Sequence, residues 1–333
     1  MTIEQTIVQM ARDAKKAASV LGRCDTPRKN QTLLAMADLL EQQADAIFRE
    51  NRKDLERAEA AGLSAAMVDR LRVDEKTIAS MAGGLREVAG YDDPVGTMGP
   101  TRMRPNGLRV ARMRIPLGVI GIIYESRPNV TIDAAGLCLK SGNAVILRGG
   151  SEAIASNRAL ARIIAQALES TGLPPQAAQV VPTEDRAAVN ALLAQEEFVD
   201  LIIPRGGEGL IRFVVEHSKI PVLKHYKGVC HVFVDESADL EMAMDIAFNA
   251  KVQRPGVCNA METLLVHRQV ARDFLPAMAR RFAEAGVELR GCPDACAILP
   301  EATPAVEADW PAEYLNLTLA VKVVEGIDTA MEH

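Results

Sequence analysis

A single cysteine in the run R-P-G-V-C-N-A, residues 254–260, has the sequence surroundings of a nucleophile. Cys258 follows Pro255 and Gly256, a pair that ends a helix and imposes an irregular turn. A strand-like run, E-T-L-L-V-H, comes shortly afterwards. We expect this thiol at the mouth of a sheet, where its reactive thiolate form would be exposed. The alternative is that Cys258 is a small apolar residue of the core, the usual place of an intracellular cysteine.

Two glycine-rich turns that carry arginines are candidates for binding phosphate. They are R-G-G-S, Arg148–Ser151, and P-R-G-G-E-G, Pro204–Gly209. Glycines let backbone N–H groups approach a phosphate closely, and each arginine adds a full positive charge. Neither run matches G-x-G-x-x-G, and each alone could be an ordinary turn. Two basic glycine turns on one edge of one sheet nevertheless predict a phosphorylated ligand, most simply a dinucleotide.

The elements that position these residues begin with a helical region over residues 2 to about 90. Pro and Gly are frequent from residue 92 to 105, which predicts a loop. Within the helical region, Thr2 and Gln5 have the capping-box pattern, and Thr26 before Pro27 is typical of an N-cap. The apolar spacing over residues 31–61 predicts one helix that ends at Gly62.

From Gly107 onward the apolar pattern changes from helical to strand-like. G-L-R-V-A-R-M-R-I alternates apolar and basic residues, as a half-exposed strand would, and P-L-G-V-I-G-I-I-Y reads as a fully buried strand. Strands then alternate with helices, which predicts parallel, doubly wound sheets with ligands at the carboxyl ends of the strands. The expected strands are 144–148, 178–182, 199–204, 221–224, 229–235 and 263–267; the expected helices start near 129, 152, 186, 207, 238 and 270.

Composition excludes several classes of function. The chain has 333 residues, of which 48% are hydrophobic and 25% charged, so a globular protein of about two domains is expected. A net charge of −6 argues against nucleic acid as a partner, and no apolar run is long enough to span a bilayer. Six scattered cysteines suit a reducing cytoplasm, and Cys292 with Cys296 lacks the second ligand pair of a zinc site.

Taken together, these runs resemble the glutamate-5-semialdehyde dehydrogenase (γ-glutamyl phosphate reductase) family, part of the aldehyde dehydrogenase superfamily. The resemblance covers nearly the whole chain. It is carried by residues 116–131, 140–153, the R-G-G-E-G run, 225–235 and 253–263. It implies an α/β, aldehyde-dehydrogenase-like fold, with a helical region and NADP-binding domain over 1–227 and a catalytic domain over 228–333 that lacks the family's C-terminal segment.

The resemblance implies NADPH-dependent reduction of γ-glutamyl phosphate to glutamate 5-semialdehyde and phosphate, a step of proline biosynthesis. Cys258 would attack the acyl phosphate and expel phosphate, and hydride transfer to the resulting thioester would give the aldehyde. Asn129 is the implied amide donor to the oxyanion, although a helix N-cap is an equally open reading of that residue.

Further residue roles follow from the same resemblance. Oxidising members of the superfamily carry a hydrolytic glutamate where this chain has His225, and its absence suits a reductase that releases phosphate. His225 could instead move a proton or bind phosphate. Arg148 occupies a position that faces the adenosine ribose, where an arginine suits a 2′-phosphate. The implied cofactor-binding set is Arg148, Gly149, Gly150, Ser151, Arg205, Gly206, Gly207 and Glu313, and the substrate-binding candidates are Arg127, Arg254 and Asn259.

The resemblance also implies that the family forms homo-oligomers, and the oligomeric state of this chain stays open. Channelling of γ-glutamyl phosphate from glutamate 5-kinase is likewise an open expectation. No metal, nucleic acid or membrane partner is expected. Two alternative functions remain at this stage: a non-catalytic, partner-binding relic of the enzyme, and a CoA-acylating aldehyde dehydrogenase.

Overall fold

A computed structural model describes residues 1–125 and 127–333; Ser126, which belongs to the 116–131 motif, lies outside the described residues. The chain forms two compact units, Met1–Lys224 and His225–His333. The division falls close to the boundary after residue 227 that the sequence predicts. The two units are described separately below.

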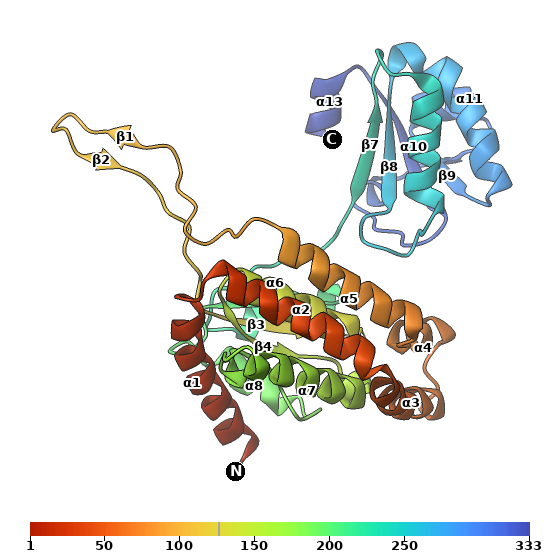
Figure 1. Cartoon of the computed structure of the whole chain (residues 1–333). Helices are drawn as coiled ribbons and strands as arrows, with labels where there is room; N and C mark the ends of the chain where they lie inside the picture. The colour runs from red at the N-terminus through yellow and green to blue at the C-terminus, as the bar shows by residue number, and fades with distance from the viewer. Residues whose placement is uncertain (126) are drawn as a thin grey trace. The chain divides into compact units, whose positions relative to one another are not determined.

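The first unit begins with the expected helical region (Figure 1). The Thr2–Gln5 capping box is present. Thr26 is not the N-cap of the second helix, because the Asp25 side chain accepts from the Arg28 amide and Thr26 becomes the first helical residue. The predicted helix over residues 31–61 is interrupted at Gln43. The helices are α1 Ile3–Leu21, α2 Thr26–Gln42, α3 Ala44–Ala60, α4 Ala65–Leu71 and α5 Glu75–Gly90.

A four-stranded parallel sheet forms the centre of this unit, in the order β5-β4-β3-β6. Its strands are β3 Val119–Tyr124, β4 Ala144–Arg148, β5 Ala178–Val180 and β6 Leu201–Arg205. The connecting helices are α6 Asn129–Lys140, α7 Ile154–Ser170 after a 3₁₀ turn over Ser151–Ala153, α8 Ala187–Leu193 after β5, and α9 Glu208–His217 after β6. Strands and helices therefore alternate as the sequence predicts, and β3 is buried along its whole length.

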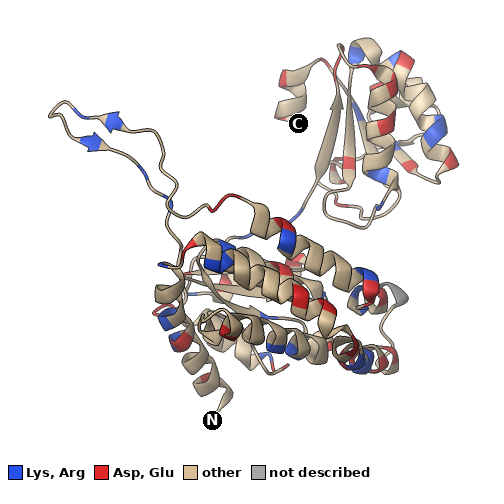
Figure 2. Ribbon diagram, viewed as in Figure 1, with Lys and Arg blue, Asp and Glu red and all other residues tan. Residues whose placement is uncertain are grey.

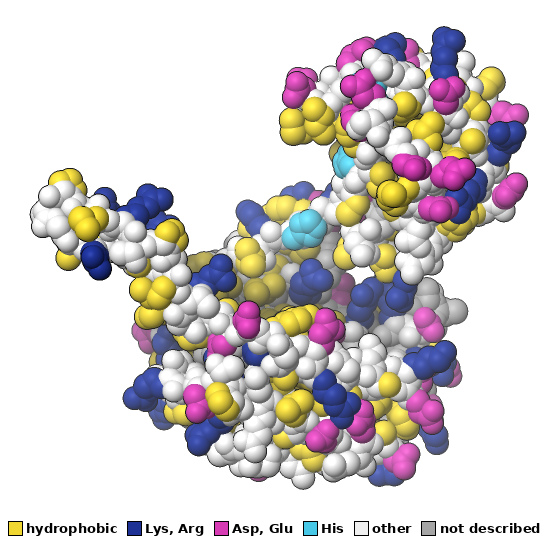
Figure 3. Space-filling view, turned by 45° about the horizontal axis from the view of Figure 1, so that its top comes forward, with side chains coloured by type: hydrophobic (Ala, Val, Ile, Leu, Met, Phe, Trp, Pro, Cys, Tyr) yellow, Lys and Arg dark blue, Asp and Glu magenta, His cyan; other side chains and the backbone are white. Residues whose placement is uncertain are grey.

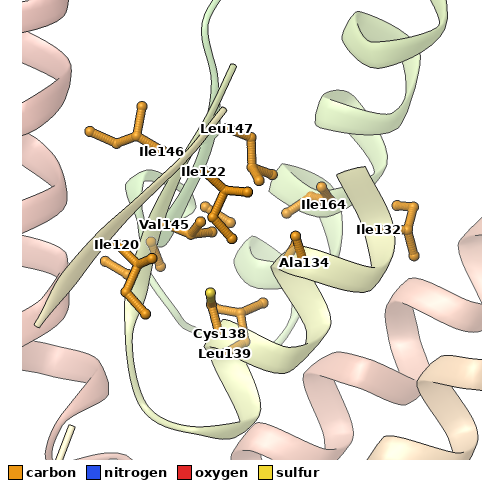
Figure 4. Close-up of a cluster of buried hydrophobic side chains, with 14 of the residues drawn as sticks. Ile120, Ile122, Ile132, Ala134, Cys138, Leu139, Val145, Ile146, Leu147 and Ile164 are labelled. Atoms are coloured by element: carbon orange, nitrogen blue, oxygen red, sulfur yellow. The ribbon is translucent and has the colours of Figure 1, made fainter. Parts of the chain in front are cut away.

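The core of the first unit lies between this sheet and the helices that cover it. Figure 4 shows part of it, where apolar side chains of β3 and β4 meet those of α6 and α7. Cys138 belongs to this cluster, and burial raises the pKa of its thiol to about 12. This cysteine is a core residue and not a nucleophile. The labelled members are Ile120, Ile122, Ile132, Ala134, Cys138, Leu139, Val145, Ile146, Leu147 and Ile164.

Two strand predictions in the first unit need correction. The run from Gly107 to Ile115 is not a half-exposed strand of the main sheet. Its one strand, β2, Arg109–Val110, pairs with β1, Arg102–Met103, in an exposed hairpin with apolar and basic side chains (Figure 3), and Met113 forms an isolated bridge with Met98. The expected strand over 221–224 is reduced to a single bridge between Ile202 and Val222, since Pro221 has no N–H with which to extend the pairing.

The second unit contains a five-stranded parallel sheet in the order β10-β9-β11-β8-β7. Its strands are β7 Cys230–Val234, β8 Met261–His267, β9 Glu288–Gly291, β10 Thr303–Pro304 and β11 Thr318–Val324. The helices are α10 Leu240–Val252, α11 Arg268–Glu284, α12 Pro293–Ile298 and α13 Ile327–Glu332. β8 is buried at every residue, so the strand that follows the Cys258 turn is a rigid support.

Charged side chains of both signs are distributed over the helices of each unit (Figure 2). Within the described residues, the structure has no helix that is both long and apolar enough to cross a membrane. Nor do His, Cys, Asp and Glu side chains form a group of three or more that could hold a metal ion in that part of the chain.

Candidate active site

Cys258 lies in the turn that joins α10 to β8. The helix ends at Val252, the backbone turns through Pro255 and Gly256, and the Ala260 amide donates to the Val257 carbonyl at 3.1 Å just before the strand begins. Of the six cysteines, all of which the structure describes, only Cys258 is exposed. The sequence expectation of an exposed thiol between a turn and a strand is therefore confirmed, and the core alternative is wrong.

Gly228 brings the start of β7 against the backbone of Cys258. A Cβ at Gly228 would lie 2.6 Å from the Cys258 carbonyl oxygen and 3.5 Å from Oε1 of Glu313. A side chain there would have to displace the Cys258 turn, so glycine is required by close approach. The same contacts place the Glu313 carboxylate beside the nucleophile loop. The sequence predicts Glu313 and Cys258 as separate site residues, and the structure shows that both adjoin Gly228.

Glu262, the second residue of β8, is buried and connects β8 to the end of α10 and to the loop that contains Glu313. Its Oε2 accepts from the Lys251 ammonium at 2.7 Å, and its Oε1 accepts from the Leu315 amide at 3.1 Å. Both charged side chains are buried, with 0% and 1% of their surface exposed. Leu315 has a positive φ of 54°, which is unusual for a side chain of this size. One carboxylate thus ties the end of α10 and the loop after Glu313 to β8.

The loop of Glu313 is also held on its other side. The Tyr314 hydroxyl donates to Oδ1 of Asp309 at 2.9 Å, and the Arg290 guanidinium donates to the same oxygen at 2.6 Å. Burial raises the pKa of Asp309, but hydrogen bonds from the Val306 amide, Arg290 and Tyr314 outweigh it and lower the pKa overall. Asp309 is therefore held as a carboxylate.

The first glycine turn follows β4 in the first unit and carries features expected of an anion site. The Arg148 guanidinium is partly buried, and its Nη2 donates to the Glu184 carbonyl at 3.1 Å. Its Nε is buried, and no described residue offers it a hydrogen-bond acceptor. Burial lowers the pKa of Arg148 overall, although the nearby Glu152 carboxylate raises it, and Arg186 lowers it further. A buried donor without an acceptor beside a second arginine fits an anionic ligand group.

Gly149 explains why this turn contains glycine. A Cβ at that position would collide with the Asn157 amide and would lie 3.1 Å from two ring atoms of Tyr124. Those side chains belong to a buried hydrogen-bonded group, in which the Tyr124 hydroxyl and Thr131 hydroxyl are 2.6 Å apart and Thr131 donates to Asn157 at 2.9 Å. The turn is therefore packed tightly against the sheet, and its residues fit the close approach of a phosphorylated ligand.

In the second glycine turn, after β6, a side-chain carboxylate already accepts a hydrogen bond from a backbone amide. The Gly207 amide donates to the Glu125 carboxylate at 3.0 Å, and a Cβ on Gly206 would lie 2.6 Å from the Glu125 Cδ. A phosphate would have to displace this carboxylate to reach the amide. Arg205 is exposed at the same turn. The Glu152 carboxylate likewise lies against Gly150 in the first turn. The first turn is the stronger candidate for a phosphate group because the buried Nε of its Arg148 has no acceptor among the described residues.

Asn129 is the first residue of α6, and the N-cap of that helix is Pro128. The N-cap reading of Asn129 is therefore wrong. Its side-chain amide donates to Oδ2 of Asp133 at 3.1 Å, one turn further along the helix. An Asn129 that acts as an oxyanion donor would use the amide hydrogen not taken by Asp133, or would exchange partners.

The remaining predicted residues are distributed over both units and are mainly exposed. Arg127 and Ser151 lie in the first unit, and His225, Arg254 and Asn259 lie in the second. The residues that sequence reasoning missed are Gly228, Cys230, Lys251, Glu262 and Glu125. One signal was available for Glu262, because it is the only carboxylate in the strand-like run E-T-L-L-V-H, which is buried throughout; a glycine or cysteine gives no comparable signal.

The chain was compared with known proteins. The family model described as "Aldehyde dehydrogenase family" matches residues 2–294. The chain is 61% identical over 333 residues to the "Gamma-glutamyl phosphate reductase" of Desulfatibacillum aliphaticivorans and 59% identical to that of Geobacter metallireducens. In both cases the match covers 100% of this chain and 80% of the relative.

Solved structures give the same relationship. The fold is similar to gamma-glutamyl phosphate reductase from Thermotoga maritima, with a TM-score of 0.90, 44% identity, and coverage of 98% of this chain and 79% of that one. The enzyme of the same name from Saccharomyces cerevisiae has a TM-score of 0.63 and 32% identity, over 100% of this chain and 83% of its own. An acetylating aldehyde dehydrogenase from Geobacillus thermoglucosidasius, with a TM-score of 0.64 and 17% identity over 99% of this chain and 77% of its own, shares the fold alone.

Proposed function

Because the chain belongs to the aldehyde dehydrogenase family, and within it to the gamma-glutamyl phosphate reductases, we propose that it reduces γ-glutamyl phosphate to glutamate 5-semialdehyde and phosphate. NADPH is the proposed cofactor, and proline biosynthesis is the proposed pathway. The observation that carries this proposal is the exposed Cys258 thiol in the turn before a buried strand, beside the Glu313 carboxylate.

In the proposed reaction, the Cys258 thiolate attacks the acyl carbon of γ-glutamyl phosphate. The carbon–oxygen bond to phosphate breaks, and a thioester on Cys258 remains. The hydride that reduces this thioester would come from NADPH bound next to Cys258. The resulting thiohemiacetal collapses, releases the aldehyde and returns the thiolate. Because phosphate is released when the thioester forms and hydride then reduces that thioester, no hydrolytic base is needed. The family resemblance implies that His225 replaces such a base.

The residues proposed to hold the cofactor follow from the described contacts. Arg148, with its buried Nε and its position after β4, would bind the 2′-phosphate, and Gly149–Gly150 would let the ligand approach the backbone. Glu262 of β8 accepts a hydrogen bond from the Leu315 amide and so holds the loop that contains Glu313. The Glu313 carboxylate would accept a hydrogen bond from a ribose hydroxyl of the cofactor. Arg254 and Asn259 flank Cys258 in the sequence and are exposed, so they are the proposed contacts for the substrate's charged groups.

The direct test is the consumption of NADPH with γ-glutamyl phosphate generated in situ, together with the reverse reaction from semialdehyde, phosphate and NADP. Cys258→Ala should abolish turnover in both directions and leave cofactor binding unchanged. Cys296→Ala, a change of a partly buried thiol in the same unit, is the matched control and should retain activity.

The same assay separates the alternatives. A requirement for coenzyme A in place of phosphate would favour the acylating aldehyde dehydrogenase. Cofactor binding without turnover, under conditions in which a characterised relative is active, would favour a non-catalytic relic.

A further inference from the structure

Cys230 lies against the Cys258 loop and has no role in the proposed reaction. Its thiol donates to the Cys258 carbonyl, with 3.4 Å between Sγ and the oxygen. Cys230 is the first residue of β7 and pairs with Met261, the first residue of β8, which the chain reaches soon after Cys258. Strand pairing therefore fixes the two cysteines beside each other within one unit.

The local backbone favours this juxtaposition in two further ways. The register of β7 against β8 shifts between Cys230 and His231, and an irregularity of this kind redirects the side chains next to it. Gly228, two residues earlier, lets the backbone approach the Cys258 carbonyl without a side chain between them. The contact between Cys230 and the Cys258 loop is thus built into the start of β7.

The two thiols differ in accessibility. Cys258 is exposed, whereas Cys230 is partly buried. Burial raises the pKa of Cys230, and the neighbouring Cys258, Glu262 and Glu313 raise it further. Cys230 therefore remains mainly a protonated thiol at neutral pH, and an oxidant in solution reaches Cys258 first.

We propose that Cys230 is the resolving thiol of Cys258, so that oxidation of Cys258 by a hydroperoxide ends in an intramolecular Cys230–Cys258 disulfide. In the first step, the Cys258 thiolate attacks the terminal peroxide oxygen, the O–O bond breaks, and the departing oxygen leaves after protonation as an alcohol, or as water when hydrogen peroxide is the oxidant. Cys258 becomes a sulfenic acid. In the second step, the Cys230 sulfur attacks the Cys258 sulfur, the S–OH bond breaks, and hydroxide leaves with the Cys230 proton as water. Two thiols lose two electrons in total, and the peroxide gains them.

Formation of this disulfide requires only a local change. A disulfide needs Cα atoms about 4.4–6.8 Å apart. The Cys230 sulfur lies 3.4 Å from the carbonyl oxygen of its intended partner, so the proposal calls for rotation of the Cys258 side chain together with movement of its exposed turn. The other cysteine pair of this unit behaves differently, because Cys292 is buried and its Sγ accepts from the Ala295 and Val323 amides at 3.4 Å.

The test uses the whole protein, hydrogen peroxide as the oxidant, and peptide mass analysis with and without dithiothreitol. In the unsubstituted protein, we expect a Cys230–Cys258 linked peptide and nearly full recovery of the Cys258 thiol on reduction. In Cys230→Ser, Cys258 should pass to the sulfinic and sulfonic acids, which dithiothreitol does not reverse. Cys296→Ser is the matched control and should behave like the unsubstituted protein. Thermal melts of each variant, together with Cys230→Ala, show whether loss of the thiol alters the fold.

Three outcomes would overturn the proposal. They are irreversible oxidation of Cys258 at the same rate with and without Cys230, a link from Cys258 to another cysteine of the chain, and a disulfide only between two copies of the chain. None of these readouts depends on turnover. The disulfide proposal can therefore fail while the proposed reductase function holds, and the reductase function can fail while the disulfide forms.

Discussion

The Lys251 ammonium and the Glu262 carboxylate form a buried ion pair, with 2.7 Å between Nζ and Oε2. Lys251 lies in the last turn of α10, and Glu262 is the second residue of β8. The ion pair therefore joins the two elements that the Cys258 turn connects. The second oxygen of Glu262 fixes the loop that follows Glu313. The nucleophile and the proposed cofactor ligand are therefore positioned by one carboxylate.

Removing one member of this pair should destabilise the second unit strongly. Glu262→Ala leaves a buried ammonium and the Leu315 amide without an acceptor, and such a change typically costs about 3–5 kcal/mol. Urea unfolding followed by the fluorescence of Trp310, the single tryptophan of the chain, would measure it. The control is Glu288→Ala, which removes an exposed partner of Arg290 and should cost less than about 1 kcal/mol. A similar cost for both variants would contradict the anchoring role.

A methyl group at Gly228 should impair activity more than folding. In Gly228→Ala the added Cβ meets the Cys258 carbonyl oxygen at 2.6 Å, so the nucleophile turn must move. A displacement of about 1 Å in an active site can lower the rate about a hundredfold. We expect kcat to fall while the melting temperature changes little. Gly83→Ala, where a Cβ meets nothing within 4 Å, is the control and should leave kcat unchanged.

Arg148 should determine the preference for NADPH over NADH. The loss of a charge-assisted hydrogen bond to the 2′-phosphate costs about 1.5–3 kcal/mol. In Arg148→Ala, NADPH should accordingly bind about ten- to a hundredfold more weakly, and NADH should be affected far less. Titrations of cofactor fluorescence measure both affinities without turnover. Equal weakening of the two cofactors would show that Arg148 acts only by holding the Glu184 carbonyl.

Stability of the first unit should fall in acid through Asp93. This carboxylate lies 2.5 Å from the buried Lys29 ammonium. Burial raises the pKa of Asp93, but hydrogen bonds from Lys29, the Thr26 hydroxyl and the Val95 amide outweigh it, and the net pKa is lowered. A lowered pKa in the folded state gives stability that is present above the unfolded value of about 3.9 and is lost as the pH falls through the folded value.

Urea unfolding at a series of acidic pH values, followed by circular dichroism, checks this. Asp93→Asn should be less stable than the unsubstituted protein at neutral pH, and the difference should shrink as the pH falls below about 4. Asp69→Asn, which alters an exposed carboxylate of α4, should leave the pH profile unchanged. A constant difference between Asp93→Asn and the unsubstituted protein across the whole range would show that the Asp93 charge does not stabilise the fold.

The sequence by itself determined the parallel α/β class and the exposed Cys258. These conclusions rest on local patterns: apolar periodicity separates helices from buried strands, and Pro255-Gly256 forces a turn before a strand wherever the rest of the chain lies. The same local patterns were insufficient for the run from Gly107 to Ile115. Its alternation gives a strand, but only tertiary pairing decides between a place in the main sheet and an exposed hairpin.

Tertiary structure alone decided which residues surround the nucleophile. Cys230, Glu262 and Glu313 come from β7, β8 and the loop before β11, and the order of strands brings both carboxylates and Cys258 near Cys230. Tertiary structure likewise distinguished the two glycine turns, which are similar in sequence. One leaves a buried Arg148 donor without an acceptor among the described residues, and the other already binds the Glu125 carboxylate. The physical reason is that contacts between residues distant in the chain depend on strand order and register, which local sequence does not encode.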